Sequence, residues 1–133
     1  MGYATEADML TAFSETELIQ LTDRLGTGLL DADVLARALA DASAEIDGYL
    51  ARYAGQVLTL PILTLYCCDM ARYRLYRDAA PEEVRTRYRD AIRYLERVAA
   101  GQVSLGAAAE AAVPDNVVSF TPGQKVFARE DLD

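Results

Sequence analysis

One apolar stripe does most to limit what this chain can fold into. Between residues 31 and 53, apolar side chains recur every three or four positions, which is the spacing of one buried face of an α-helix. The stripe consists of Val34, Leu35, Ala38, Leu39, Ala42, Ile46, Leu50 and Tyr53. Asp31 stands just before it and can cap the first backbone amides. The pattern predicts one long helix that is buried along one side.

Two shorter helices are predicted ahead of this stripe. Thr5 can cap the first, which runs to Phe13. Ser14 and Glu17 have the spacing of a capping box, in which Ser14 accepts a hydrogen bond from the backbone and Glu17 reaches back to it. After these helices Gly26 and Gly28 interrupt the pattern, and we expect a loop there.

Two long helices are predicted after the stripe. Pro61 is well placed to begin one, and its first turns, residues 62–68, are almost wholly apolar, as expected of a central element. Adjacent Cys67 and Cys68 lie in this run and are expected to act as small buried hydrophobes. Pro81 begins the last helix, whose inner face is Val84, Tyr88, Ala91, Ile92, Leu95 and Val98. We therefore expect an all-α fold, a small bundle of four to five helices.

The pattern changes after Gly101. An alanine-rich stretch leads to Pro114, and from there the chain reads as extended. This end contains too many large apolar side chains for a simple linker and too few strand signals for a sheet of its own. We expect residues 1–106 to form a helical domain and residues 107–133 to form an extended C-terminal arm that docks on a neighbouring subunit or another partner.

Composition argues against most chemical functions. The formal net charge of −8 disfavours a general DNA binder, because duplex affinity comes largely from neutralised phosphates. No run of 18 apolar residues predicts a membrane span. The chain has no histidine, which is the commonest general base and metal ligand. Asp31 and Asp33 lack the further ligands of a calcium loop. We expect no enzyme activity, no catalytic residues, no metal and no cofactor.

Arginines on the last helix form a pattern of their own. They recur every four residues, on a face turned away from the apolar one, at Arg85, Arg89, Arg93 and Arg97. The simplest interpretation is a solvated face, since surface ion pairs contribute little to stability. The functional interpretation is a docking face for the acidic first half of a second copy, because residues 1–50 contain ten acids and two arginines. Such head-to-tail contacts close into rings when the rotation permits.

Short motifs in a fixed order run along almost the whole chain. They are Tyr3-Ala4-Thr5, Glu17-Leu18-Ile19-Gln20-Leu21-Thr22-Asp23, Glu45-Ile46-Asp47-Gly48-Tyr49-Leu50, Asp69-Met70-Ala71-Arg72-Tyr73 and Phe127-Ala128-Arg129-Glu130-Asp131-Leu132. In these motifs the chain resembles the Mu-like prophage family of small proteins encoded among head and neck genes. The layout is also similar to that of head-to-tail connectors of other tailed phages.

The resemblance implies a structural virion protein, a head-to-tail connector that forms a ring below the portal, with about 12 copies. It implies contacts with the portal and with other neck or tail proteins, and DNA that passes through without specific binding. The implied location is the virion neck, after assembly in the bacterial cytoplasm. The partner contacts suggested in the arm are Phe120, Phe127, Arg129 and Leu132.

Two other functions stay open at this point. One is a phage-encoded regulatory protein or inhibitor that covers a host protein, which would also need no active site. The other is an enzyme or DNA-binding module, against which the missing histidine, the acidic charge and the absence of motifs weigh. The copy number in purified particles separates the connector from the regulator.

Overall fold

The computed structural model describes residues 2–53, 60–103 and 105. In this part of the chain every regular element is a helix, as predicted, and no strand is present. The elements are α1 (Glu6–Ala12), α2 (Glu15–Thr22), α3 (Ala32–Tyr49), η1 (Ala51–Tyr53), α4 (Pro61–Tyr76), η2 (Arg77–Ala79) and α5 (Glu82–Ala99). The chain divides into two units, residues 1–103 and 104–133, and all of these helices lie in the first.

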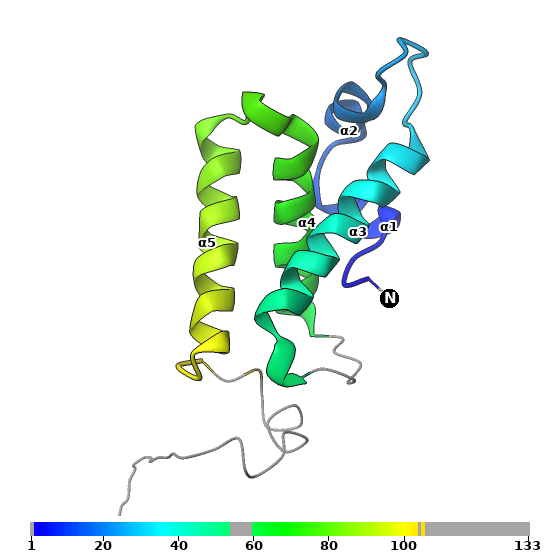
Figure 1. Cartoon of the computed structure of the whole chain (residues 1–133). Helices are drawn as coiled ribbons and strands as arrows, with labels where there is room; N and C mark the ends of the chain where they lie inside the picture. Colours follow the sequence, from blue (N-terminus) through cyan, green and yellow to red (C-terminus); the bar gives the residue numbers. More distant parts are fainter. Residues whose placement is uncertain (1, 54–59, 104, 106–133) are drawn as a thin grey trace, which may run out of the picture. The chain divides into compact units, whose positions relative to one another are not determined.

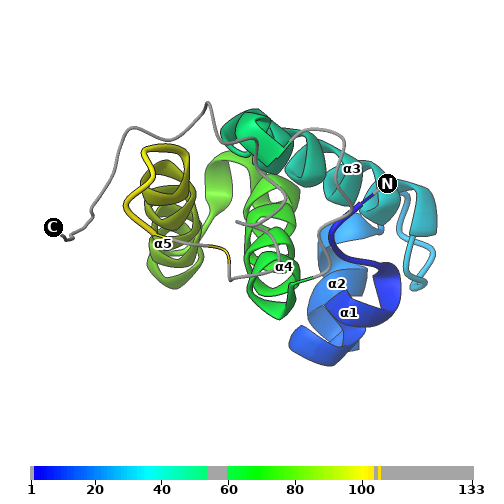
Figure 2. The same ribbon diagram turned by 90° about the horizontal axis from the view of Figure 1, so that it is seen from below.

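Helix α4 is the centre of this unit. Figures 1 and 2 show α5 on one side of α4 and the short helices α1 and α2 on the other, with α3 crossing α4 at an angle. The apolar start of α4 explains its position, since a helix that is apolar on most sides must be covered on most sides. Both cysteines are buried there as free thiols, as predicted, and burial raises the pKa of Cys68 to about 12.

The helix starts follow from capping residues. Asp31 accepts hydrogen bonds from the amides of Asp33 and Val34 and so opens α3, and Pro61 is the first residue of α4, both as predicted. Thr5 caps α1 in a complete capping box with Asp8. At the far end, Gly101 follows α5 with a φ of +78°. Glycine adopts this left-handed conformation without steric cost, and the helix ends here.

The predicted capping box of Ser14 and Glu17 is only half correct. Ser14 does accept a hydrogen bond from the amide of Glu17. The carboxylate of Glu17 does not return to the cap, however, because it binds Arg72 and Tyr76 on α4. A tertiary ion pair with two hydrogen bonds from arginine outcompetes a single local one. Glu17 therefore ties α2 to α4.

Tyrosines fill the outer layer of the bundle, with their hydroxyls at its rim. The rings of Tyr73 and Tyr88 stack with their centroids 4.1 Å apart, which joins α4 to α5. The Tyr88 hydroxyl donates to Glu45 on α3, so this one ring links three helices. Burial first, and then the Glu45 carboxylate, raise the pKa of Tyr88. Within the part of the chain that is described, no helix is long and apolar enough to cross a membrane.

Candidate interaction surface

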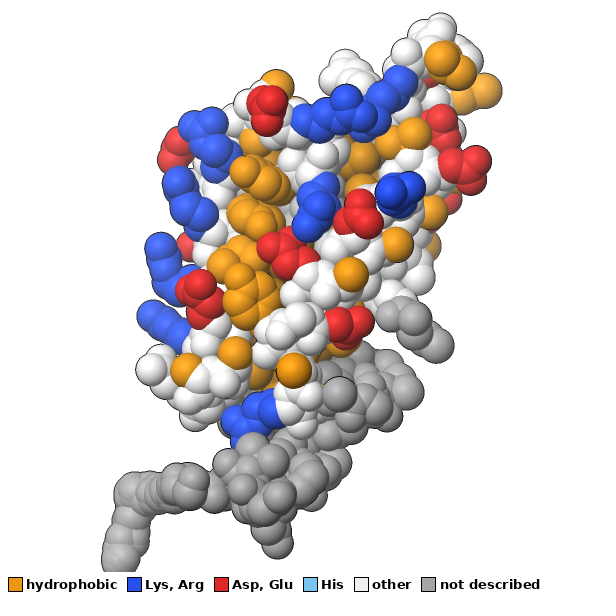
Figure 3. Space-filling model, viewed as in Figure 1, with side chains coloured by type: hydrophobic (Ala, Val, Ile, Leu, Met, Phe, Trp, Pro, Cys, Tyr) orange, Lys and Arg blue, Asp and Glu red, His pale blue; other side chains and the backbone are white. Residues whose placement is uncertain are grey.

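The four arginines predicted as a docking face lie together on the outer side of α5, and we call them the arginine row. All four of Arg85, Arg89, Arg93 and Arg97 are exposed. Figure 3 shows basic side chains along this edge of the molecule. The opposite face of α5 is buried against its neighbours through Val84, Ala91, Leu95 and Val98. The helical wheel therefore placed the row correctly.

Acidic neighbours neutralise only the first part of the arginine row. Glu82 lies 2.8 Å from Arg85 and 3.2 Å from Arg89, measured between carboxylate oxygen and guanidinium nitrogen. These hydrogen bonds and charges lower the pKa of Glu82. Asp90 is 3.6 Å from Arg93, and Arg97 has no ion pair within residues 2–53, 60–103 and 105. Arg97, at the C-terminal end of the row, is thus free to bind a carboxylate of another molecule.

The loop between α2 and α3, residues 23–31, forms the opposite edge of the unit. Figures 1 and 2 both show this loop far from α5. Two leucines point into solvent from it, Leu25 with 87% of its surface exposed and Leu29 with 69%. Single exposed leucines are common, but two on one short loop form an apolar projection that water hydrates poorly. We call this segment the leucine loop.

The leucine loop is held in shape by its own hydrogen bonds. The Asp23 carboxylate accepts from the amides of Thr27 and Gly28 at 2.8 and 2.6 Å, and these bonds lower its pKa. The buried Thr22 hydroxyl accepts from the amide of Asp31 at 3.0 Å and closes the base of the loop. A loop ordered in this way loses little further entropy when its leucines dock on a partner.

The acidic first half of the chain offers a counterpart to the arginine row. Several of its carboxylates are exposed and form no ion pair with any residue that the structure describes: Glu6, Glu15, Asp33 and Asp47. These residues lie on α1, α2 and α3, whereas the row lies on α5. This separation of charge is partial, because α5 itself also carries Glu82, Glu83, Asp90 and Glu96.

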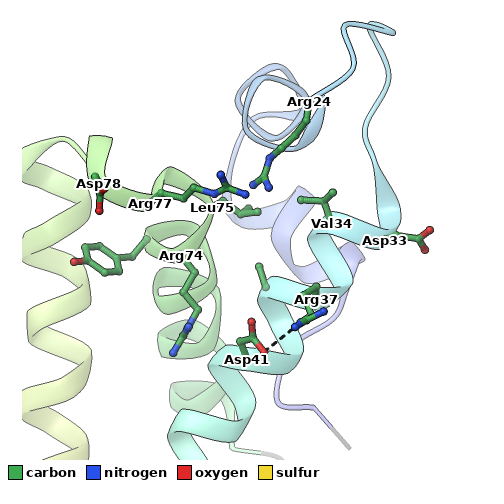
Figure 4. A pocket seen from close by; sticks show the side chains of 11 residues that line it. Arg24, Asp33, Val34, Arg37, Asp41, Arg74, Leu75, Arg77 and Asp78 are labelled. Atoms are coloured by element: carbon green, nitrogen blue, oxygen red, sulfur yellow. Dashed lines mark ion pairs between the residues drawn. The ribbon is translucent and has the colours of Figure 1, made fainter.

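A groove of about 610 Å³ opens between the end of α2, the first turns of α3 and the end of α4. We call it the arginine groove, because four arginines line it. Its charged lining consists of Arg24, Arg37, Arg74 and Arg77 together with Asp33, Asp41 and Asp78. Figure 4 shows Arg24 and Arg77 pointing toward one another and Asp33 pointing away from the groove. The apolar lining includes Val34, Ala38 and Leu75.

The arginines of the groove fall into two pairs. Arg37 lies 3.7 Å from Asp41 and Arg74 lies 3.0 Å from Glu45, so each has a carboxylate partner. Arg24 and Arg77 have no ion pair and no side-chain hydrogen bond with a residue in the described ranges. Nothing in the sequence pattern signalled this groove, because its lining comes from three segments and follows no helical period.

A buried carboxylate lies under α5 and has a structural role. Asp69 on α4 is 6% exposed, and Arg87 approaches one of its oxygens at 3.7 Å, too far for a hydrogen bond. Burial raises the pKa of Asp69, and the charges of Arg87 and Arg72 offset only part of the effect. The residues that the structure describes contain no group of three metal-ligating side chains. The arm residues Phe120, Phe127, Arg129 and Leu132 lie outside the described residues.

Comparison with known proteins gives a family for this helical architecture. The family described as Bacteriophage Mu, Gp36 matches residues 3–120. The chain belongs to the Mu Gp36 family. It is 35% identical to "Gene product J" of Escherichia phage Mu over 136 aligned positions, which cover 98% of this chain and 96% of that protein. It is 38% identical to "Mu-like prophage FluMu protein gp36" of Haemophilus influenzae over 106 positions, 78% of this chain and 75% of that protein.

This result confirms the resemblance drawn from the motifs: the chain is a protein of Mu-like phages and prophages. Of the surface features of this chain described above, the sequence had indicated the arginine row but neither the leucine loop nor the arginine groove. Leu25 precedes Gly26 and Leu29 follows Gly28, so the two exposed leucines could have been noticed as apolar residues around a turn.

Proposed function

We propose that this Gp36-family protein is a structural component of the phage particle, a head-to-tail connector that forms a ring below the portal. One observation carries the proposal: complementary surfaces lie at opposite edges of one small helical unit. The arginine row is on α5, whereas the leucine loop and the exposed acids of α1 and α2 lie on the other side of α4.

The separation of these surfaces favours head-to-tail contact. If row and acids were on the same face, two copies could satisfy each other as a closed dimer. Surfaces on opposite edges instead leave one of each free after every contact, and such chains of copies close into rings when the rotation fits. Burial of Leu25 and Leu29 against the next copy would add apolar contact area to the charge pairing.

The overall charge fits a wall around passing DNA. With a net charge of −8, the chain repels phosphates, so a duct built from it would let the duplex slide without holding it. We propose that the other partners are the portal and further neck or tail proteins, and that the arm, at Phe120, Phe127, Arg129 and Leu132, docks on a neighbouring subunit or on one of these partners. The protein would act in the virion neck after assembly in the host cytoplasm, without catalysis.

The first experiment is electron microscopy of lysates from a phage or prophage that lacks this gene. We expect separate tails and DNA-filled or leaky heads, because the joint between them is missing. Restoration by the gene supplied on a plasmid is the control. Complete, infectious particles without the gene would reject the connector and leave the alternative, a regulatory protein or inhibitor that binds a host protein.

The arginine row is tested in the same complementation assay. Arg89→Glu with Arg93→Glu reverses two charges at exposed positions, so the fold should survive while joined particles are lost. The matched control is Arg89→Lys with Arg93→Lys, which keeps both charges and should restore assembly. If the charge-reversed protein still builds normal particles, the row is a solvated surface only. Mass spectrometry of purified particles should find about 12 copies, and none for a regulator.

A further inference from the structure

We propose that the arginine groove is a receptor for an acidic peptide segment, and that the segment it takes is residues 127–133 of a second copy. The choice of a second copy rests on the connector proposed above, whereas the binding of carboxylates by the groove does not.

Arg24 and Arg77 form the anion-binding part of the groove. They come from opposite walls, the end of α2 and the end of α4, and point toward one another (Figure 4). Two like charges facing one another without a carboxylate between them repel. A carboxylate that enters between them is bound by two guanidinium groups, each of which can donate two parallel hydrogen bonds.

The backbone at Arg77 separates this arginine from an ordinary surface side chain. Its φ is +56° and its ψ is −126°, the conformation of the first central residue in a type II′ turn, which favours glycine. A glycine would form this end of α4 without strain. The arginine is strained there, and its guanidinium lies in the groove. Strain of this kind at a non-glycine residue is commonly associated with functional sites.

The floor of the groove selects a peptide rather than a free anion or DNA. Leu75, 5% exposed, lies with Val34 and Ala38 between the charged residues and can receive one aliphatic side chain. Asp41 and Asp78 also line the groove and would repel the continuous charge of a nucleic acid backbone. The lining therefore fits a segment that alternates carboxylates with an apolar residue.

Residues 127–133 have this composition. Their sequence is Phe-Ala-Arg-Glu-Asp-Leu-Asp, with carboxylates at 130, 131 and 133 and a leucine between them. The other segments outside the described residues are poorer in acids, since 54–59 contain none and 106–126 contain only Glu110 and Asp115. Arg129 can in addition pair with Asp41 or Asp78 at the edge of the groove. Charge complementarity thus singles out this segment.

The test measures binding of a fluorescein-labelled peptide of residues 124–133 to the full chain by polarisation. The receptor carries Glu130→Gln, Asp131→Asn and Asp133→Asn in its own arm, so that its arm does not compete. We expect binding that weakens as the salt concentration rises. When Arg24→Ala and Arg77→Ala are added to this receptor, the affinity should fall about tenfold or more. The matched control, Thr11→Glu with Gln102→Glu, changes the net charge equally at exposed positions outside the groove and should bind almost normally.

Three results would overturn the proposal. They are the absence of binding at millimolar peptide, an equal loss in the groove variant and the control variant, and equal binding of a peptide with the same residues in scrambled order. The assay uses the isolated chain, so its outcome is independent of whether the gene deletion separates heads from tails. A connector that lacks this contact would show no specific peptide binding, and deletion of its gene would still separate heads from tails.

Discussion

Two arginines near the end of α4 have opposite roles, although they are only five positions apart in the sequence. The side chain of Arg72 is 12% exposed and donates to both oxygens of Glu17 at 2.9 and 3.2 Å. Its guanidinium also lies over the ring of Phe13, 4.5 Å from the centroid. Arg77 is exposed, lacks an ion pair with any described residue and has a backbone conformation that favours glycine.

Arg72 stabilises the fold, whereas Arg77 is available to a binding partner. Arg72 links α2 to α4 through the hydrogen bonds that its Nε and one Nη donate to Glu17. Arg77 contributes no such tie, and its backbone conformation subtracts from stability. If this distinction is correct, changes at Arg72 should alter the free energy of unfolding, while changes at Arg77 and Arg24 should alter binding. Four predictions test it, beginning with the largest effect.

Replacement of Arg72 by alanine should lower the free energy of unfolding by about 3 kcal/mol, because it leaves the half-buried Glu17 carboxylate with Tyr76 as its remaining partner. Urea denaturation followed by circular dichroism measures this. Arg72→Lys keeps the charge but cannot donate two parallel hydrogen bonds, so it should recover only part of the loss. A loss below about 1 kcal/mol for the alanine variant would place Arg72 among ordinary surface arginines.

The pH dependence of the free energy of unfolding should reveal the ion pair between Arg72 and Glu17. Burial by itself would raise the pKa of Glu17, but the hydrogen bonds from Arg72 and Tyr76 and the Arg72 charge hold it below its ordinary value of 4.5. A carboxyl with a lowered folded-state pKa stabilises the fold above its unfolded pKa. This contribution should therefore be complete above pH 4.5 and disappear as the pH falls through the lower folded value.

The measurement is the unfolding free energy of the wild type and of Glu17→Gln between pH 7 and pH 3. The difference between the two proteins should shrink below pH 4.5. Asp69 has a raised pKa, so its contribution has the opposite sign, but it is present in both proteins and cancels in the difference. A difference that stays constant over this range would mean that Glu17 titrates as it does in the unfolded chain.

The fold was largely predictable from the sequence because its signals are local. The stripe from Val34 to Tyr53, the cap at Asp31 and the proline at residue 61 each act within a few residues of themselves, and the structure has helices that begin where these signals predict. The stripe does not form one continuous helix, however, because α3 ends at Tyr49 and Ala51–Tyr53 form the separate 3-10 helix η1. In the capping box of Ser14 and Glu17, the half that was wrong, the return of the Glu17 carboxylate to the cap, failed for the opposite reason. A capping box and a salt bridge need the same carboxylate, and only the packing of α2 on α4 decides between them.

The third prediction concerns the strained residue. Arg77→Gly should raise the free energy of unfolding by about 1 kcal/mol, since glycine adopts a φ of +56° without steric cost while it adds some entropy to the unfolded chain. Thermal and urea unfolding measure the gain. Arg77→Ala is the control, because it removes the guanidinium but retains the Cβ, and it should give no such gain. If both variants unfold alike, the backbone at residue 77 is relaxed in solution.

The candidate site was only partly predictable. The arginine row could be found because its period of four matches one face of a helix. Arg24 and Arg77 have no such relation, since they follow the ends of α2 and α4 and meet only after the chain has folded. The leucine loop left only a weak signal, two leucines around a glycine turn. The sequence does not show that the hydrogen bonds of Asp23 and Thr22 hold this turn in shape.

The smallest expected effect on stability is at Arg24. Its side chain is exposed and pairs with no described residue, so Arg24→Ala should change the free energy of unfolding by less than about 0.5 kcal/mol. Removal of one of two facing positive charges should even relieve some repulsion, which would be strongest at low salt. Unfolding at two salt concentrations tests both points. Arg72→Ala and Arg24→Ala each remove one positive charge from the chain. The difference between their unfolding free energies therefore measures how much an arginine stabilises the fold when it has a carboxylate partner. A large loss of stability at Arg24 would mean that this side chain holds the end of α2, and the groove would then lose half of its binding site.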